Sequence, residues 1–165
     1  MIPAVSFIGH HNTGKTRLLA QLIPHLSGRG FRVGAVKHAP HLAAPSNAGT
    51  DSGALAAAGA EPVLLLRETD AALTWRLAAD EGIEALIARL FHGCDLVLVE
   101  GFKRGALPKL EVFRRSRETA HDPLAGEIDV IAVITDDRIA APDGTIVLSP
   151  RDLPAIADLI ESILF

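Results

Sequence analysis

The chain has 165 residues, of which 48% are hydrophobic, and this is enough apolar material for the core of one globular domain. Aromatic residues make up only 4% and the net charge is −4 with histidine neutral, which argues against a base-stacking platform or a broad basic surface for nucleic acid. Cys94 is the only cysteine, so a disulfide framework is excluded. Because no apolar run approaches the length of a membrane span and no signal-peptide pattern begins the chain, we expect a cytoplasmic protein with neither nucleic-acid nor membrane partners.

Short apolar runs alternate with longer segments of helical period, which predicts an α/β architecture. No internal repeat or linker interrupts this alternation, so residues 1–165 are expected to form a single domain. Two segments, 37–47 and 118–127, have no clear period and are expected to be loops. In chain order, we expect a strand at 3–8, a helix at 15–27, a strand at 31–36, a helix at 51–58, strands at 62–66 and 71–77, a helix at 81–91, strands at 95–99, 107–113, 128–134 and 145–148, and a helix at 152–164.

Residues 9–16 match the phosphate-binding pattern G-x-x-x-x-G-K-[ST], and they lie between an apolar strand and an amphipathic helix, as the pattern requires. A turn that contains glycine lets backbone N–H groups surround a polyphosphate, and the helix N-terminus adds a partial positive charge. We therefore predict a nucleotide site, with Lys15 at the terminal phosphates and the Thr16 hydroxyl on Mg²⁺. The predicted phosphate-binding residues are Gly9, His10, His11, Asn12, Thr13, Gly14, Lys15 and Thr16.

These elements predict a three-layer P-loop NTPase fold, in which helices flank a mostly parallel central sheet. Such a protein needs an acidic residue at the end of a neighbouring buried strand to hold the metal. Glu100 ends the apolar run at 95–99, and Gly101 permits a turn after it, so Thr16 and Glu100 are the predicted metal ligands. Asp95 begins the same strand and is expected at the opposite edge of the sheet.

Lys37, His38 and His41 follow the second predicted strand, at the edge where ligands of open α/β sheets bind. Lys37 is a candidate contact for an anion. The two histidines are compatible with a solvated loop or with a metal site, and solvated loops are the commoner case.

Thr50 and Asp51 begin a predicted helix, and two interpretations of them stay open. Either residue suits an N-cap, because both side chains accept backbone N–H groups. Asp51 also suits a switch segment that lies close to Mg²⁺ or to the attacking water.

Three further polar positions follow buried or extended segments. Lys103 adds a cation close to Glu100, although an exposed lysine is an equally simple interpretation. Arg114 belongs to a basic cluster that is either a solvated face or an anion site. Asp136 follows the predicted strand at 128–134, where P-loop GTPases place the acidic residue that recognises guanine, but the usual Asn/Thr-Lys-x-Asp pattern is missing.

In this order, the motifs resemble the molybdopterin-guanine dinucleotide biosynthesis protein B (MobB) family of P-loop GTP-binding adapters. The resemblance covers nearly the whole chain, and its Lys-His, Asp-Ser and Val-Glu-Gly-Phe-Lys motifs are much more specific than a P-loop alone. It is carried by Ile2-Pro3, Gly9–Thr16, Leu18-Leu19, Leu22-Ile23, Gly30 to Lys37-His38 with His41, Asp51-Ser52, Ala58-Gly59-Ala60, Leu98 to Lys103, Lys109–Arg114 and Ile131–Asp136.

The resemblance implies a homodimer that binds GTP with Mg²⁺, hydrolyses it slowly, and assists a MobA-like guanylyltransferase that couples GMP to molybdopterin. By matching position, Lys15 and Asp51 are the implied catalytic residues, with Asp51 in the switch region. The implied lining of the anionic-ligand cleft is Lys37, His38, Lys103 and Arg114. Thr50 stands where the family usually has lysine, and the loop before it lacks the family's acidic residues, which affects the switch segment more than nucleotide binding.

Three other functions are compatible with the same residues. A small-molecule or nucleotide kinase would use Arg114–Glu127 as its lid. A metal-insertion GTPase would use His10, His11, His38 and His41 as ligands, because the two pairs are expected at the ends of adjacent strands. A scaffold protein would retain the loop without its activity.

Overall fold

The structure is a computed structural model that describes residues 2–40, 50–78, 81–115 and 121–165. Contacts divide the chain into two compact units, one made of residues 1–38 with 83–165 and the other of residues 39–82. Within the described residues, no helix is long and apolar enough to cross a membrane.

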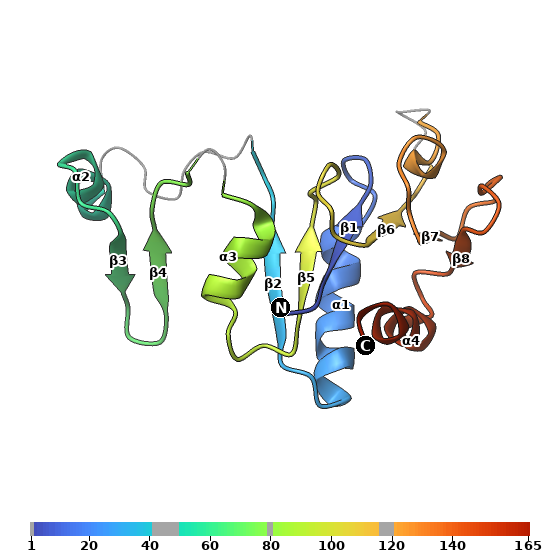
Figure 1. The fold of residues 1–165 in the computed structure, drawn as a ribbon, viewed down its shortest axis with the longest axis horizontal. Helices are drawn as coiled ribbons and strands as arrows, with labels where there is room; N and C mark the ends of the chain where they lie inside the picture. The colour runs from blue at the N-terminus through green and yellow to red at the C-terminus, as the bar shows by residue number, and fades with distance from the viewer. Residues whose placement is uncertain (1, 41–49, 79–80, 116–120) are drawn as a thin grey trace. The chain divides into compact units, whose positions relative to one another are not determined.

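The first unit is built on a parallel sheet to which six strands of the described chain contribute, in the order β2-β5-β1-β6-β7-β8 (Figure 1). The central strands are continuous in hydrophobicity because both faces of a parallel sheet are covered, and all of β1 and most of β5 are buried. The predicted strands are present, and most are shorter than expected, above all the one predicted at 128–134; β5 has the expected length and lies one residue later. The strands are β1 (Ala4–Ile8), β2 (Val33–Lys37), β5 (Leu96–Glu100), β6 (Lys109–Val112), β7 (Ala132–Ile134) and β8 (Ile146–Leu148).

Helices cover both faces of this sheet. On one face, α1 (Lys15–Gly28) and α4 (Leu153–Leu164) share a core with Val5 and Phe7 of β1. On the other face, α3 (Ile83–Leu90) packs against Ala4 of β1 and against β5. Successive residues of a strand point to opposite faces, so β1 supplies both cores. The prediction of a three-layer fold with a mostly parallel sheet is confirmed.

The second unit contains α2 (Asp51–Ala57), β3 (Val63–Leu66) and β4 (Ala71–Thr74). The two strands pair antiparallel with each other, in a sheet separate from the parallel one. The apolar run of β3 has the composition of a buried strand, yet Leu64, Leu65 and Leu66 are 54%, 44% and 70% exposed. In a two-stranded sheet most side chains are exposed to solvent, whatever their composition. The apolar composition of β3 therefore does not predict that its side chains are buried.

A buried carboxylate fixes the segment that follows β6. Glu111 is fully buried in β6, and its two oxygens accept the backbone N–H groups of Leu124, at 2.7 Å, and of Ala125, at 2.9 Å. These donors begin a short 3₁₀ helix, Leu124–Gly126, inside the region predicted to be a loop. The carboxylate therefore holds this turn against the sheet.

Replacing Glu111 with alanine is expected to lower the free energy of unfolding by about 2–4 kcal/mol, because two buried N–H groups lose a charged acceptor. Urea unfolding followed by circular dichroism measures the change. Glu127→Ala is the control, since Glu127 is exposed in the same segment and its loss should cost no more than about 0.5 kcal/mol. Equal stability of the two variants would show that the Glu111 contacts do not hold the turn.

Candidate functional site

The loop between β1 and α1 has the backbone of a phosphate cradle. Gly9 has φ +147°, and a Cβ atom on it would lie 2.3 Å from the carbonyl oxygen of Val112 in β6, so only glycine fits there. Asn12 and Gly14 also have positive φ, at 59° and 96°, and Gly14 is the N-cap of α1. The Thr13 hydroxyl donates to the His10 carbonyl at 3.1 Å and closes the turn. The loop therefore curls in front of the α1 N-terminus, where anions bind.

Lys15 lies across this loop. Its ammonium donates to the carbonyl oxygens of Gly9, at 3.2 Å, and of His10, at 2.5 Å. Burial lowers the pKa of Lys15 below its usual range; Glu100 opposes this shift, and the charges of Lys103 and Lys37 add to it. A partly dehydrated ammonium close to other cations favours an anionic partner, and a polyphosphate supplies one.

Thr16 and Glu100 meet at the predicted metal position although they are 84 residues apart. The Thr16 hydroxyl donates to Glu100 Oε2 at 2.8 Å, and the Glu100 side chain is 14% exposed. Mg²⁺ holds oxygen ligands at about 2.0–2.1 Å in an octahedron, which places neighbouring ligands about 2.9 Å apart. The hydroxyl and carboxylate oxygens therefore fit a magnesium ion, in both chemistry and spacing.

The same pair also contacts a cation from the protein itself. Lys37 ends β2 directly opposite Glu100 in the parallel register. Its ammonium lies 3.2 Å from Glu100 Oε1 and 3.2 Å from the Thr16 hydroxyl. Lys37 was predicted as an anion contact, and the structure places it at the metal pair.

His38 and Lys103 flank this group on the segments after β2 and β5. The His38 ring packs against Phe102, with ring centroids 4.6 Å apart, and its backbone N–H donates to the Glu100 carbonyl at 2.9 Å. A Cβ on Gly101 would lie 3.1 Å from the Cβ of His38, so the two turns pack closely. Lys103 is near enough to Lys15 to lower the pKa of its ammonium.

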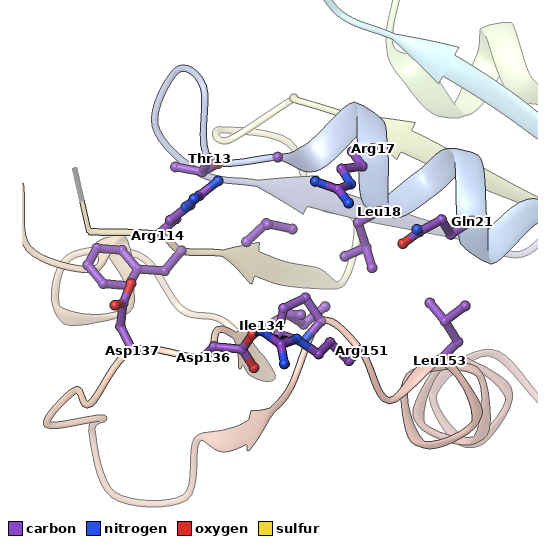
Figure 2. A pocket seen from close by; sticks show the side chains of 14 residues that line it. Thr13, Arg17, Leu18, Gln21, Arg114, Ile134, Asp136, Asp137, Arg151 and Leu153 are labelled. Atoms are coloured by element: carbon purple, nitrogen blue, oxygen red, sulfur yellow. Dashed lines mark ion pairs between the residues drawn. The ribbon is translucent and has the colours of Figure 1, made fainter.

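A cavity of about 660 Å³ opens beyond the cradle, between α1 and the ends of β6 and β7 and the residues after β8 (Figure 2). Arg17 enters it from α1, and Arg114 from the segment after β6. Asp136 is held in its wall, where it accepts the Ser149 hydroxyl at 2.6 Å and pairs with Arg151 at 3.2 Å.

Sequence reasoning missed two cations of this cavity. Arg17 and Arg151 line it, and neither was singled out beforehand. Asp137, next to the predicted Asp136, lines it as well and accepts the backbone N–H of Arg115 at 2.6 Å, which joins the turns after β6 and β7. The available signal for Arg151 was the position of 149–151 directly after a predicted parallel strand, because such ends share the edge with the P-loop.

Of the other predicted residues, Asp51 belongs to the second unit and His41 to the residues outside the description. Asp51 begins α2 in the second unit, where Thr50 is the N-cap and accepts the Gly53 N–H at 3.1 Å, so a catalytic role for Asp51 stays a prediction. His41 lies outside the described residues. The His10 ring stacks on His121, with centroids 4.4 Å apart. Across the described residues, no group of three or more His, Cys, Asp or Glu side chains could hold a metal.

Comparisons with known proteins find a matching family model and similar sequences. The family model described as molybdopterin guanine dinucleotide synthesis protein B matches residues 4–136, which include the cradle, Glu100 and Asp136. The chain is 33% identical to the molybdopterin-guanine dinucleotide biosynthesis adapter protein of Escherichia coli (strain K12), over 97% of this chain and 92% of that protein. It is 35% identical to the adapter protein of the same description from Haemophilus influenzae, over 98% and 89% of the two chains.

Solved structures support the fold. A crystal structure of molybdopterin-guanine biosynthesis protein B superposes with a TM-score of 0.74 at 25% identity, covering 98% of this chain and 99% of that one. The structure of MobB from Bacillus subtilis gives a TM-score of 0.73 at 24% identity, over 99% and 98% of the chains. Both overlaps extend over almost the whole length.

Replacing Lys15 with alanine is expected to weaken binding of a nucleoside triphosphate by about tenfold to a hundredfold, because a charge-assisted contact to the phosphates is lost. Titration calorimetry in Mg²⁺ measures the dissociation constant. Lys109→Ala is the matched control, since Lys109 begins β6 and donates to the Leu107 carbonyl, away from the cradle. Unchanged affinity in the Lys15 variant would contradict the assignment of the cradle.

Proposed function

Because the chain belongs to the molybdopterin guanine dinucleotide synthesis protein B family, we propose that it is a cytoplasmic GTP-binding adapter in the biosynthesis of the molybdopterin guanine dinucleotide cofactor. The observation that carries this proposal is the meeting of the cradle, Thr16 and Glu100 at one edge of the parallel sheet. Family membership supplies the pathway, and the geometry supplies the ligand chemistry.

The described residues support a division of tasks at the site. The 9–16 backbone and Lys15 bind the β- and γ-phosphates, and Thr16 and Glu100 hold Mg²⁺. When bound, the metal neutralises phosphate charge and orients the terminal phosphate. We expect hydrolysis to be slow. Asp51 is the candidate for orienting the attacking water, and Thr50 stands next to it where the family usually has lysine. The loss of that cation is expected to weaken catalysis.

The preference for guanine is assigned to the cavity beyond the cradle. A carboxylate suits the N1–H and amino group of guanine, whereas adenine presents an acceptor at N1. Asp136 is fixed in this cavity by Ser149 and Arg151, and Asp137 lies next to it. Arg17 and Arg114 line the same cavity and add two cations to it (Figure 2).

The adapter role requires partners. We propose that the chain works with a MobA-like guanylyltransferase and that molybdopterin, an anionic ligand, reaches the same edge of the sheet through Lys37, His38 and Lys103. The relatives from Escherichia coli and Haemophilus influenzae are molybdopterin-guanine dinucleotide biosynthesis adapter proteins, which supports an adapter role in this pathway. Co-purification of the chain with a guanylyltransferase, in the presence and absence of GTP, tests the partnership.

We also propose that the protein is a homodimer and that the second unit forms the contact. Leu64 and Leu66 alternate along β3 and are more than half exposed, and Leu73 of β4 is 43% exposed. An exposed apolar strand edge is a template for pairing with another chain, and pairing with a second copy would bury these leucines.

Asp136→Asn is expected to weaken GTP binding by about tenfold to a hundredfold while leaving ATP binding unchanged, because the guanine N1–H and amino group lose an anionic acceptor. Side-by-side titrations with the two nucleotides in Mg²⁺ measure this. Asp143→Asn, on the exposed loop between β7 and β8, is the control. If the Asp136 variant keeps the wild-type preference for GTP, guanine is not recognised by this carboxylate.

Leu66→Glu is expected to shift the protein from dimer to monomer at micromolar concentration, since a charge would be buried at the contact. Analytical ultracentrifugation measures the distribution. Leu90→Glu, which changes a 41% exposed leucine of α3, should leave the dimer intact. A monomeric wild-type protein would overturn the dimer proposal.

A further inference from the structure

The ammonium of Lys37 lies where its positive charge would stand next to a divalent metal held by Thr16 and Glu100. Its ammonium is 3.2 Å from Glu100 Oε1 and 3.2 Å from Thr16 Oγ1, and those two residues are joined at 2.8 Å between the hydroxyl and Oε2. The three side chains form a closed group in which Lys37 is the only cation. Lys37 thus contacts the two residues that are best suited to hold Mg²⁺.

Metal binding and this contact compete for the same atoms. The Thr16 hydroxyl accepts from Lys37 and donates to Glu100, and the second Glu100 oxygen is taken by Lys37 itself, so a metal held by this pair would share its ligand atoms with Lys37. An ammonium has no lone pair with which to join the coordination shell, and it repels a second cation at this distance. A metal therefore binds more tightly once Lys37 has left.

The surroundings of Lys37 allow it to leave when a polyphosphate is present. Its side chain is 53% exposed and sits on a flexible four-carbon stem. Lys37 also contributes to lowering the pKa of Lys15, which places it within the field of the phosphate cradle. Without a nucleotide, departure from Glu100 forfeits an ion pair; with a nucleotide, the phosphates supply a replacement anion.

We propose that Lys37 is an internal cation that excludes divalent metal from Thr16 and Glu100 and transfers to the phosphates when a metal–nucleotide complex binds. This inference rests on the proposed nucleotide-binding function and adds a linkage to it. Free metal binds weakly because it must displace Lys37. Metal and nucleotide each raise the affinity for the other, since such coupling is reciprocal.

The test is a titration of the 165-residue chain with Mn²⁺ in the absence of nucleotide. Electron paramagnetic resonance measures the free Mn²⁺ at each point of the titration. Lys37→Met keeps the aliphatic stem and removes the charge, and it should bind Mn²⁺ about tenfold or more tightly than wild type. Adding Glu100→Gln to that variant should abolish the gain, because the metal then loses its carboxylate ligand.

Arg104→Met is the matched control for general electrostatics. Arg104 is an exposed cation on the segment after β5, but among the described residues only Lys37 bridges Thr16 and Glu100. The control should change Mn²⁺ affinity by less than about threefold, since a neighbouring exposed charge is screened. Equal gains in the Lys37 and Arg104 variants, or no gain in the Lys37 variant, would overturn the inference.

A second titration separates this inference from the proposed function. Wild-type protein that binds no GTP in Mg²⁺ would refute the nucleotide site, whatever Mn²⁺ does alone. If wild type binds GTP, Mg²⁺ should strengthen that binding by a larger factor than it does in Lys37→Met, because the variant has already lost the competing cation. Equal factors would leave the nucleotide site standing and reject the transfer of Lys37.

Discussion

Parallel pairing of β1, β2 and β5 is the constraint on which the rest of the site depends. In this register, Lys37 lies opposite Glu100 and Glu100 opposite Phe7, so the three strands end at one level. Buried apolar side chains fix β1 and β5 on both faces, and the half-buried Val33 and Val36 of β2 pack against the two cores. A shift by one residue would turn these side chains to the wrong face. The positions of the functional groups therefore follow from the packing of the core.

The loops that leave this edge pack closely, and glycine stands at two points of close approach. A Cβ on Gly9 would lie 2.3 Å from the carbonyl oxygen of Val112, and a Cβ on Gly101 would lie 3.1 Å from the Cβ of His38. The Glu111 carboxylate holds the Leu124–Gly126 turn by accepting two of its backbone N–H groups. The opposite edge of the sheet is held differently: Asp95 pairs with Arg32, and its carboxylate accepts the Arg32 backbone N–H at 2.7 Å.

The electrostatics of the site favour an anionic ligand. Burial and the charges of Lys103 and Lys37 lower the pKa of Lys15, and Glu100 opposes this shift. An anion bound next to Lys15 would stabilise the charged ammonium, which burial disfavours. The separate cavity around Asp136 gives a second, differently charged surface for the rest of a ligand.

Much of this arrangement could be predicted from residues alone. The cradle motif, the carboxylate after the apolar run at 95–99, and most element positions were predicted because local spacing and hydrophobic period report them directly. The separate pairing of β3 with β4 could not be predicted, since an apolar run has the same composition in either sheet. The contribution of Arg17 and Arg151 to one cavity was also missed, as these residues are more than 130 positions apart in a sequence that does not state strand order.

The sequence by itself determined which groups the proposed chemistry can use: a loop with the phosphate-binding pattern, the hydroxyl that follows it and a carboxylate at the end of a buried strand. Only the tertiary structure decided which side chains meet there. Strand register places Lys37 opposite Glu100, and α1 begins with Thr16 at the same edge, so the side-chain atoms of the three residues lie within 3.2 Å of their partners. The local sequence pattern determines the secondary structure of each segment, whereas the long-range packing of the sheet determines which residues come into contact.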